Sequence, residues 1–194
     1  MLYVILDSSA TYLTVGISDE NRLIDYVSYP AWQCQSEKMI PELKTLLENN
    51  KLSQKDISGV IVGIGPGSYT GIRIALTTAK ILCLSLNIPL YPISSLQLLK
   101  EDDKPTICLM NARSGRSFFG VYQGNKVIEE DRTMTNDKVK EYIESHPDYL
   151  VKGELEYLDM KDNVGNIALQ AFSLLPSLEK ADDPLAVKPV YMRG

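Results

Sequence analysis

A glycine-rich turn occupies residues 63–73 and reads Gly63-Ile64-Gly65-Pro66-Gly67-Ser68-Tyr69-Thr70-Gly71-Ile72-Arg73. The residues that lead into it, 59–64, are mostly apolar and predict a buried strand, and an apolar helical pattern follows it to about Leu86. Glycine lets a backbone turn tightly and pass close to what it faces. The sequence therefore predicts a strand, a turn and a long helix, whose first free N–H groups suit a phosphate or a carboxylate.

Two interpretations of this turn stay open. The turn is not a P-loop, because no Gly-Lys-Ser/Thr ends it. It is not a dinucleotide fingerprint either, because Thr70 stands where the third glycine would be. It is either the remnant of a nucleotide or anion loop, or a plain turn that packs a helix close to a sheet. The residues of the first interpretation are Asp7, Gly65, Gly67, Ser68, Thr70 and Arg73.

The rest of the chain predicts two lobes of similar organisation. Each half begins with strand hairpins and then alternates strands with helices, and the charged stretch 100–104 lies between the halves. We expect strands at 2–6, 12–17, 23–27, 59–64, 89–93, 106–110, 117–123, 126–132 and 149–151, and helices at 37–49, after the turn to about 86, 136–145 and 164–175. This order indicates an α/β protein with lobes at 1–101 and 102–194, each with a mixed sheet and flanking helices.

Composition and charge limit the classes of protein to which the chain can belong. The 194 residues are 44% apolar and carry a formal net charge of −5, as in an ordinary globular protein. No continuous apolar run reaches the roughly 18 residues of a membrane-spanning helix, so we expect no membrane association. Three widely spaced cysteines predict no disulfide framework, which favours the cytoplasm. Because no basic stripe with interleaved aromatic residues is present, we expect only indirect contact with nucleic acid.

Several motifs together resemble the TsaB (YeaZ) family. The turn follows Asp7-Ser8-Ser9 and precedes a long apolar helix, as in that family. Further matches are Pro92-Ile93-Ser94-Ser95-Leu96, Asn111-Ala112-Arg113-Ser114-Gly115 and the tail Pro189-Val190-Tyr191-Met192-Arg193. The second lobe departs from the pattern, because Asn111 replaces the usual aspartate and the lobe is short.

The resemblance implies a fold and a role. The fold is the actin-like ATPase (ribonuclease H-like) fold in two lobes, of which the first binds a partner. The role is that of a non-catalytic, cytoplasmic partner of the related transferase TsaD in forming N6-threonylcarbamoyladenosine in tRNA. A small ATPase, TsaE, joins that complex, and a homodimer of the isolated chain is a further expectation. Contact with tRNA would be indirect.

Few residues of this chain are of the types and in the positions that catalysis would need. In the catalytic relative two metal-binding histidines fall at positions that match Ser95 and Leu99, neither of which replaces such a ligand. The only histidine, His146, precedes a proline at the expected end of a helix, and no Gly-x-Ser-x-Gly supports a peptidase. We therefore expect no catalytic residue, metal or cofactor. The alternative function is an ATP-dependent small-molecule kinase of the same fold, using Asp7 and residues 65–71.

The long helix after the glycine-rich turn has features of a surface that binds a partner. One of its faces is apolar at helical spacing and predicts burial in the lobe, and a second face bears small and apolar side chains. A second apolar face indicates either an interface or burial on both sides within the lobe. The residues we predict for the interface are Met39, Leu43 and Leu47 of the helix at 37–49, and Ile74, Thr78, Ile81 and Ser85 of the long helix.

Overall fold

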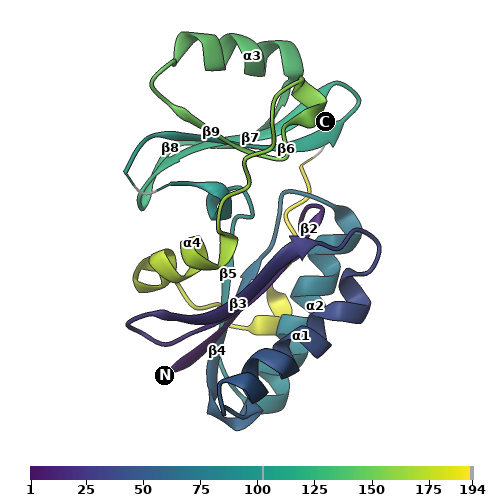
Figure 1. Ribbon diagram of the computed structural model, residues 1–194, viewed down its shortest axis with the longest axis vertical. Helices are drawn as coiled ribbons and strands as arrows, with labels where there is room; N and C mark the ends of the chain where they lie inside the picture. Colours follow the sequence, from purple (N-terminus) through teal and green to yellow (C-terminus); the bar gives the residue numbers. More distant parts are fainter. Residues whose placement is uncertain (102, 193–194) are drawn as a thin grey trace.

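The chain folds into two lobes, each built on a mixed β-sheet, as the sequence predicted (Figure 1). The structure is a computed structural model that describes residues 1–101 and 103–192. Asp102, at the expected start of the second lobe, and Arg193, in the tail motif, lie outside the described residues.

The first sheet has the strand order β3-β2-β1-β4-β5. Its strands are β1 (Leu2–Asp7), β2 (Tyr12–Ser18), β3 (Leu23–Pro30), β4 (Ile57–Gly63) and β5 (Leu90–Ile93). The first three strands pair antiparallel, whereas β1 with β4 and β4 with β5 are parallel. Val4 and Leu6 of β1 face one core and Tyr3 and Ile5 face another. Burial on both faces explains why β1 is a continuous apolar run.

Helices cover both faces of the first sheet. Two of them, α1 (Gln35–Asn49) and α2 (Tyr69–Leu86), pack with one core. The third, α4 (Ile167–Leu174), packs on the opposite face beside β1, β2 and β3. Within the described residues, α2 alone is long and apolar enough to cross a membrane by length and composition. Its inner face lies in the core of the first lobe, however, and core helices pass the same test.

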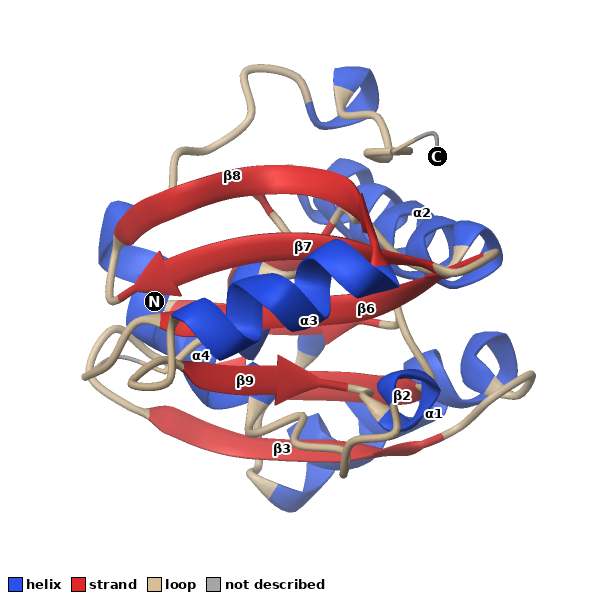
Figure 2. Cartoon of the chain, turned by 90° about the horizontal axis from the view of Figure 1, so that it is seen from above, coloured by secondary structure: helices blue, strands red, loops and turns tan. Residues whose placement is uncertain are grey.

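The second sheet has the order β8-β7-β6-β9 and is also mixed, because β9 pairs parallel with β6. Its strands are β6 (Thr106–Arg113), β7 (Arg116–Gln123), β8 (Lys126–Thr135) and β9 (Leu150–Gly153). The helix α3 (Asn136–Ser145) lies across one face, as the view from above shows (Figure 2). The other face contributes Cys108, Met110 and Tyr122 to a core that also contains β1 and α4. The two lobes are therefore joined by a common apolar core.

The lobe division we propose at residue 101 separates the two sheets but not the helices. Although α4 comes from the second half of the chain, it packs on the first sheet. The tail also returns to the first lobe, where Val190 N–H donates to the Ile64 carbonyl over 2.7 Å. Lys100, the first residue of the charged stretch between the two halves, is buried and donates to Gln170 of α4 over 3.2 Å. Burial of its apolar face stabilises α4 against the first sheet, although α4 follows the strands of the second sheet in the sequence.

Two helix starts differ from the sequence expectation. The helix α1 begins at Gln35, two residues before the expected start at residue 37, and has no side-chain cap. The buried Gln35 amide donates to the Ala10 carbonyl over 2.8 Å and ties α1 to the β1–β2 turn. The helix α4 begins three residues later than expected, because the Asn166 side chain caps it by accepting from Leu169 N–H over 2.9 Å.

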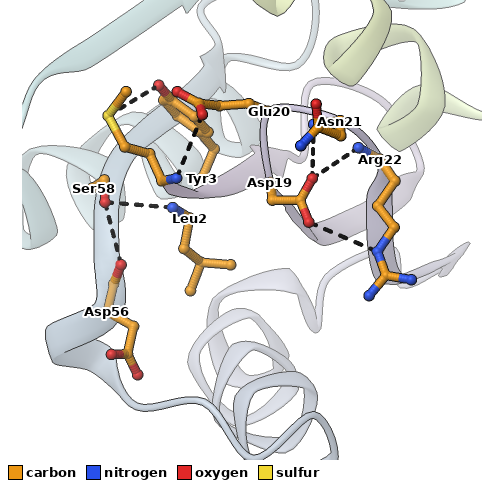
Figure 3. A network of polar contacts seen from close by, with 9 residues as sticks. Leu2, Tyr3, Asp19, Glu20, Asn21, Arg22, Asp56 and Ser58 are labelled. Atoms are coloured by element: carbon orange, nitrogen blue, oxygen red, sulfur yellow. Dashed lines mark hydrogen bonds and ion pairs between the residues drawn. The ribbon is translucent and has the colours of Figure 1, made fainter.

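The β2–β3 turn is held by hydrogen bonds to the side chain of Asp19 (Figure 3). The Asp19 carboxylate accepts from the N–H groups of Asn21 and Arg22 over 2.7 and 2.9 Å. These hydrogen bonds, led by that of Asn21, lower the pKa of Asp19. Such a side-chain to backbone bond is the reason that aspartate favours turns.

Candidate functional site

A cleft of about 670 Å³ opens between the two lobes beside the glycine-rich turn. The first lobe lines it with the β1–β2 turn, the start of α1 and the start of α2, and the second lobe with residues 110–113, Phe118 and Glu154. Three of the predicted anion-loop residues line this cleft, namely Gly67, Ser68 and Thr70. The structure brings these three together at the lobe boundary and places Asp7, Gly65 and Arg73 elsewhere.

The glycines of the turn allow it to pack directly on the β1–β2 turn. A Cβ atom at Gly67 would lie 2.2 Å from the Ser9 carbonyl oxygen, and one at Gly71 would lie 1.9 Å from the Ser8 carbonyl oxygen. Gly67 also has a φ of +154°, which L side chains rarely adopt. The backbone of Ser68 donates to the Ser9 carbonyl over 2.6 Å. The two turns thus lie in backbone contact, which leaves no room for a side chain between them.

Several N–H groups of the turn are already used within the first lobe. Gly65 N–H donates to Ser95 Oγ over 3.0 Å, and Gly71 N–H donates to Ser68 Oγ over 3.3 Å. Ser68 N–H donates to the Ser9 carbonyl. Donors that are occupied by the protein are not free for an anion. This favours the packing interpretation of the turn over the anion-loop interpretation.

Asp7 lies buried beneath the β1–β2 turn. Its carboxylate accepts from Ser9 N–H over 3.2 Å, from Ser9 Oγ over 3.0 Å and from Ser95 Oγ over 3.3 Å. Burial raises the pKa of Asp7 to about 6, although the hydrogen bonds from Ser9 and Ser95 lower it. Asp7 therefore joins the end of β1 to the end of β5, which favours a structural turn cap over a nucleotide ligand.

The pKa of Asp7 predicts a measurable pH dependence of stability. A carboxyl whose pKa is raised on folding stabilises the folded state below its unfolded pKa and loses that contribution as pH rises through its folded pKa. We expect the free energy of unfolding to fall by about 3 kcal/mol between about pH 4 and pH 7 because of this group. Asp7→Asn should lack this fall. Urea unfolding of both proteins at the two pH values tests it, and parallel pH profiles would contradict it.

Arg73 contacts the tail and not the cleft. Its Nε donates to the Tyr191 hydroxyl over 2.8 Å, and its guanidinium carbon lies 4.1 Å from the centroid of the Tyr69 ring. The Tyr69 and Tyr191 rings are stacked with their centroids 4.9 Å apart. This cation–π and stacking arrangement holds the tail against the start of α2. Arg73 therefore has a structural partner where the sequence suggested an anion.

The α1 residues predicted for a partner interface lie inside the lobe. Met39, Leu43 and Leu47 are 1%, 4% and 7% exposed and pack in the core between α1, α2 and the sheet. The expectation that they form an interface is wrong. The apolar face of α1 covers the first sheet, and helical periodicity alone does not distinguish that use from a subunit contact.

The outer face of α2 is exposed and partly apolar. Ile81 is 58% exposed and Ser85 is exposed, whereas Ile74 and Thr78 are half-buried. Leu84, 55% exposed, lies beside them and was missed from the sequence. Its spacing of three residues after Ile81 was the signal that could have found it. Of the predicted interface, Ile81 and Ser85 are therefore exposed to solvent, with Leu84 beside them.

A metal centre is not assembled in the part of the chain that the structure describes. Across residues 1–101 and 103–192, no three His, Cys, Asp or Glu side chains gather as a metal site would require. His146 stacks on the Tyr142 ring with centroids 4.1 Å apart. Ser95 and Leu99, at the positions matched to the metal histidines of the catalytic relative, are both buried.

Known proteins similar to this chain identify its family. The family described as TsaD, tRNA N6-adenosine threonylcarbamoyltransferase, matches residues 31–168. The tRNA threonylcarbamoyladenosine biosynthesis protein TsaB of Bacillus subtilis (strain 168) is 31% identical over 150 residues, which cover 74% of this chain and 65% of that protein. The chain belongs to the TsaB family. The TsaB of Buchnera aphidicola subsp. Schizaphis graminum is also 31% identical, over 70% of this chain and 67% of its own length.

Solved structures confirm the fold expected for a TsaB family member. YeaZ from Pseudomonas aeruginosa superposes with a TM-score of 0.81 at 18% identity, covering 98% of this chain and 99% of that one. A second P. aeruginosa structure, described as an uncharacterized protein with similarity to peptidase YEAZ, has a TM-score of 0.86 over 99% of both chains. At this identity the likeness concerns the fold, which is the two-lobed actin-like fold.

The motifs that resemble the TsaB family meet around the glycine-rich turn. Asn111 and Arg113 line the cleft from the second lobe, and Asn111 Oδ1 accepts from Arg113 N–H over 2.7 Å. Ser94 caps the segment after β5 by accepting from Leu96 N–H over 3.2 Å. The tail joins the turn through Val190. The tail motif therefore contacts the glycine-rich turn directly, and Asn111 and Arg113 line the same cleft as that turn.

Proposed function

We propose that this TsaB family chain is a non-catalytic partner of a TsaD-type transferase in forming N6-threonylcarbamoyladenosine in tRNA. The matched relatives carry the name of this biosynthesis, and the transferase family itself matches residues 31–168. One observation carries the non-catalytic role. Ser95, where the transferase places a metal histidine, is buried and used to hold Asp7 and Gly65 in place.

The partner surface we propose is the outer face of α2. Ile81 and Leu84 expose more than half of their side chains there, and Ser85 beside them is small. A small residue between apolar ones lets a second helix approach closely. A TsaD-type chain, which is similar in fold, would pack its own helix on this face. The same face would serve a second copy of the chain when the partner is absent, and a TsaE-type ATPase would join the assembled pair.

Contact with tRNA is proposed to be indirect. The chain has a net charge of −5 and a sequence pI of about 5.0, so its overall field repels a phosphate backbone. The transferase would therefore hold the tRNA while this chain supports the transferase. Such a role belongs in the cytoplasm, where tRNA is modified.

The kinase alternative is less well supported by the site. A kinase of this fold would need Asp7 open to the cleft and the turn free to bind phosphate. Asp7 is 2% exposed and accepts hydrogen bonds from Ser9 and Ser95, and the turn donates to the protein itself. The geometry therefore favours the partner role.

Reconstitution tests this proposal. We expect threonylcarbamoyl transfer from an activated threonylcarbamoyl donor to tRNA when this chain is mixed with a TsaD-type transferase and a TsaE-type ATPase in the presence of ATP. We expect a large loss of transfer when the chain is left out. The chain alone should neither hydrolyse ATP above background nor bind tRNA near physiological salt. Full transfer without the chain would contradict the partner role. An ATPase activity of the chain alone that Asp7→Ala abolishes would support the kinase.

A further inference from the structure

The β1–β2 turn offers two hydrogen-bond donors to the interlobe cleft, and both are bound by one carboxylate. Thr11 N–H donates to Glu154 Oε1 over 2.8 Å, and Thr11 Oγ1 donates to Glu154 Oε2 over 3.0 Å. Thr11 belongs to the first lobe, whereas Glu154 follows β9 in the second lobe, and both line the cleft. Two parallel donors on two oxygens is the geometry by which proteins recognise carboxylates and phosphates.

The turn is held in its shape by the first lobe alone. Ser8 Oγ donates to the Gly71 carbonyl over 2.8 Å, and Ser9 is bound to Asp7 through both its N–H and its hydroxyl. The Ala10 carbonyl accepts from the Gln35 amide over 2.8 Å. These contacts fix the backbone of the turn, so the Thr11 N–H is positioned without help from Glu154. Donors fixed in advance bind an anion without the cost of ordering them.

Glu154 is held just as firmly on its own side of the cleft. The Asp162 carboxylate accepts from the N–H groups of Leu155 and Glu156, the two residues that follow. Gly153, the residue before, pairs with Asn163 through two backbone hydrogen bonds of 3.0 and 2.9 Å. The second lobe thus presents Glu154 to Thr11 from a segment whose backbone is fixed by its own hydrogen bonds.

We propose that the Thr11 donors form an anion-binding site that the chain fills with its own carboxylate. Glu154 takes the position that a phosphate or a carboxylate ligand would occupy, and its charge repels any such ligand that enters the cleft. Removing it would leave two aligned donors at a cleft of about 670 Å³ that Arg113 also lines. This proposal does not depend on the partner role, because the site lies in the cleft and not on the outer face of α2.

Inorganic phosphate is the probe for this site. In the Glu154→Ala protein we expect phosphate to shift the amide NMR resonance of Thr11 in a saturable way, with a Kd in the millimolar range and at least about tenfold tighter than in the wild type. Adding Thr11→Val removes one of the two donors and should weaken that binding by about tenfold. Acetate in place of phosphate tests whether the site also takes a carboxylate, as the proposal requires.

Glu156→Ala is the matched control. It removes the same charge two residues further along, from an exposed side chain that does not line the cleft, and should leave the Thr11 resonance insensitive to phosphate. If Glu154→Ala does not fold, Glu154→Gln replaces it, because the amide keeps the shape and removes the charge. A folded variant without phosphate binding at Thr11 would overturn the proposal. Phosphate binding at Thr11 that is as tight in the wild type, or in Glu156→Ala, as in Glu154→Ala would also overturn it.

Discussion

Replacing Ile81 by glutamate is expected to abolish association with a TsaD-type transferase while the chain itself stays folded. Ile81 is 58% exposed on the outer face of α2, so the free protein solvates the new carboxylate at little cost. In a packed interface the same carboxylate is buried without a partner, which costs several kcal/mol and lowers affinity by more than about a hundredfold. Size-exclusion chromatography of the mixed proteins, read beside thermal melting of the variant alone, measures both effects.

Two further glutamate variants control for this result. Leu82→Glu introduces the same charge one residue along, where the side chain packs against the core, and should lower the melting temperature. Val127→Glu changes an exposed apolar residue of β8 in the second lobe and should leave both association and melting unchanged. If the Ile81→Glu protein associates normally, the interface does not lie on the outer face of α2. Equal melting of the Ile81 and Leu82 variants would indicate that α2 is only a core helix.

Gly67→Ala should lower the free energy of unfolding by about 3 kcal/mol or more. Its Cβ would lie 2.2 Å from the Ser9 carbonyl oxygen, which is backbone and cannot rotate away, and its φ of +154° strains any L residue. The two turns would have to separate, and their shared Ser68 to Ser9 hydrogen bond would lengthen. Equilibrium unfolding in urea measures the loss.

Gly115→Ala separates the two causes of that loss. Gly115 also has a positive φ, +70°, but a Cβ atom there meets nothing within 4 Å. Gly115→Ala should therefore lower the free energy of unfolding only by the cost of a left-handed backbone conformation, about 1 kcal/mol. Similar losses in the two variants would show that backbone conformation alone makes glycine necessary at residue 67, and that contact between the turns contributes little.

Local patterns predicted the elements of this fold well. The bounds of α3, Asn136–Ser145, agree with the sequence expectation, because a proline two residues beyond forces the helix to end. The continuous apolar run of β1 and the apolar face of α2 also predicted burial correctly. Periodicity did not tell which neighbour covers a face, so the apolar residues of α1 were assigned to a partner when they pack on the first sheet.

The sequence by itself determined the α/β class, the two lobes and the TsaB family, because these depend on short motifs and on periods of a few residues. Only the tertiary structure decided which residues meet across the cleft. Thr11 and Glu154 stand 143 residues apart, and α4 crosses to the first lobe from the second half of the chain. Such contacts form where burial of apolar faces brings distant segments together, and no local pattern records which segments those are.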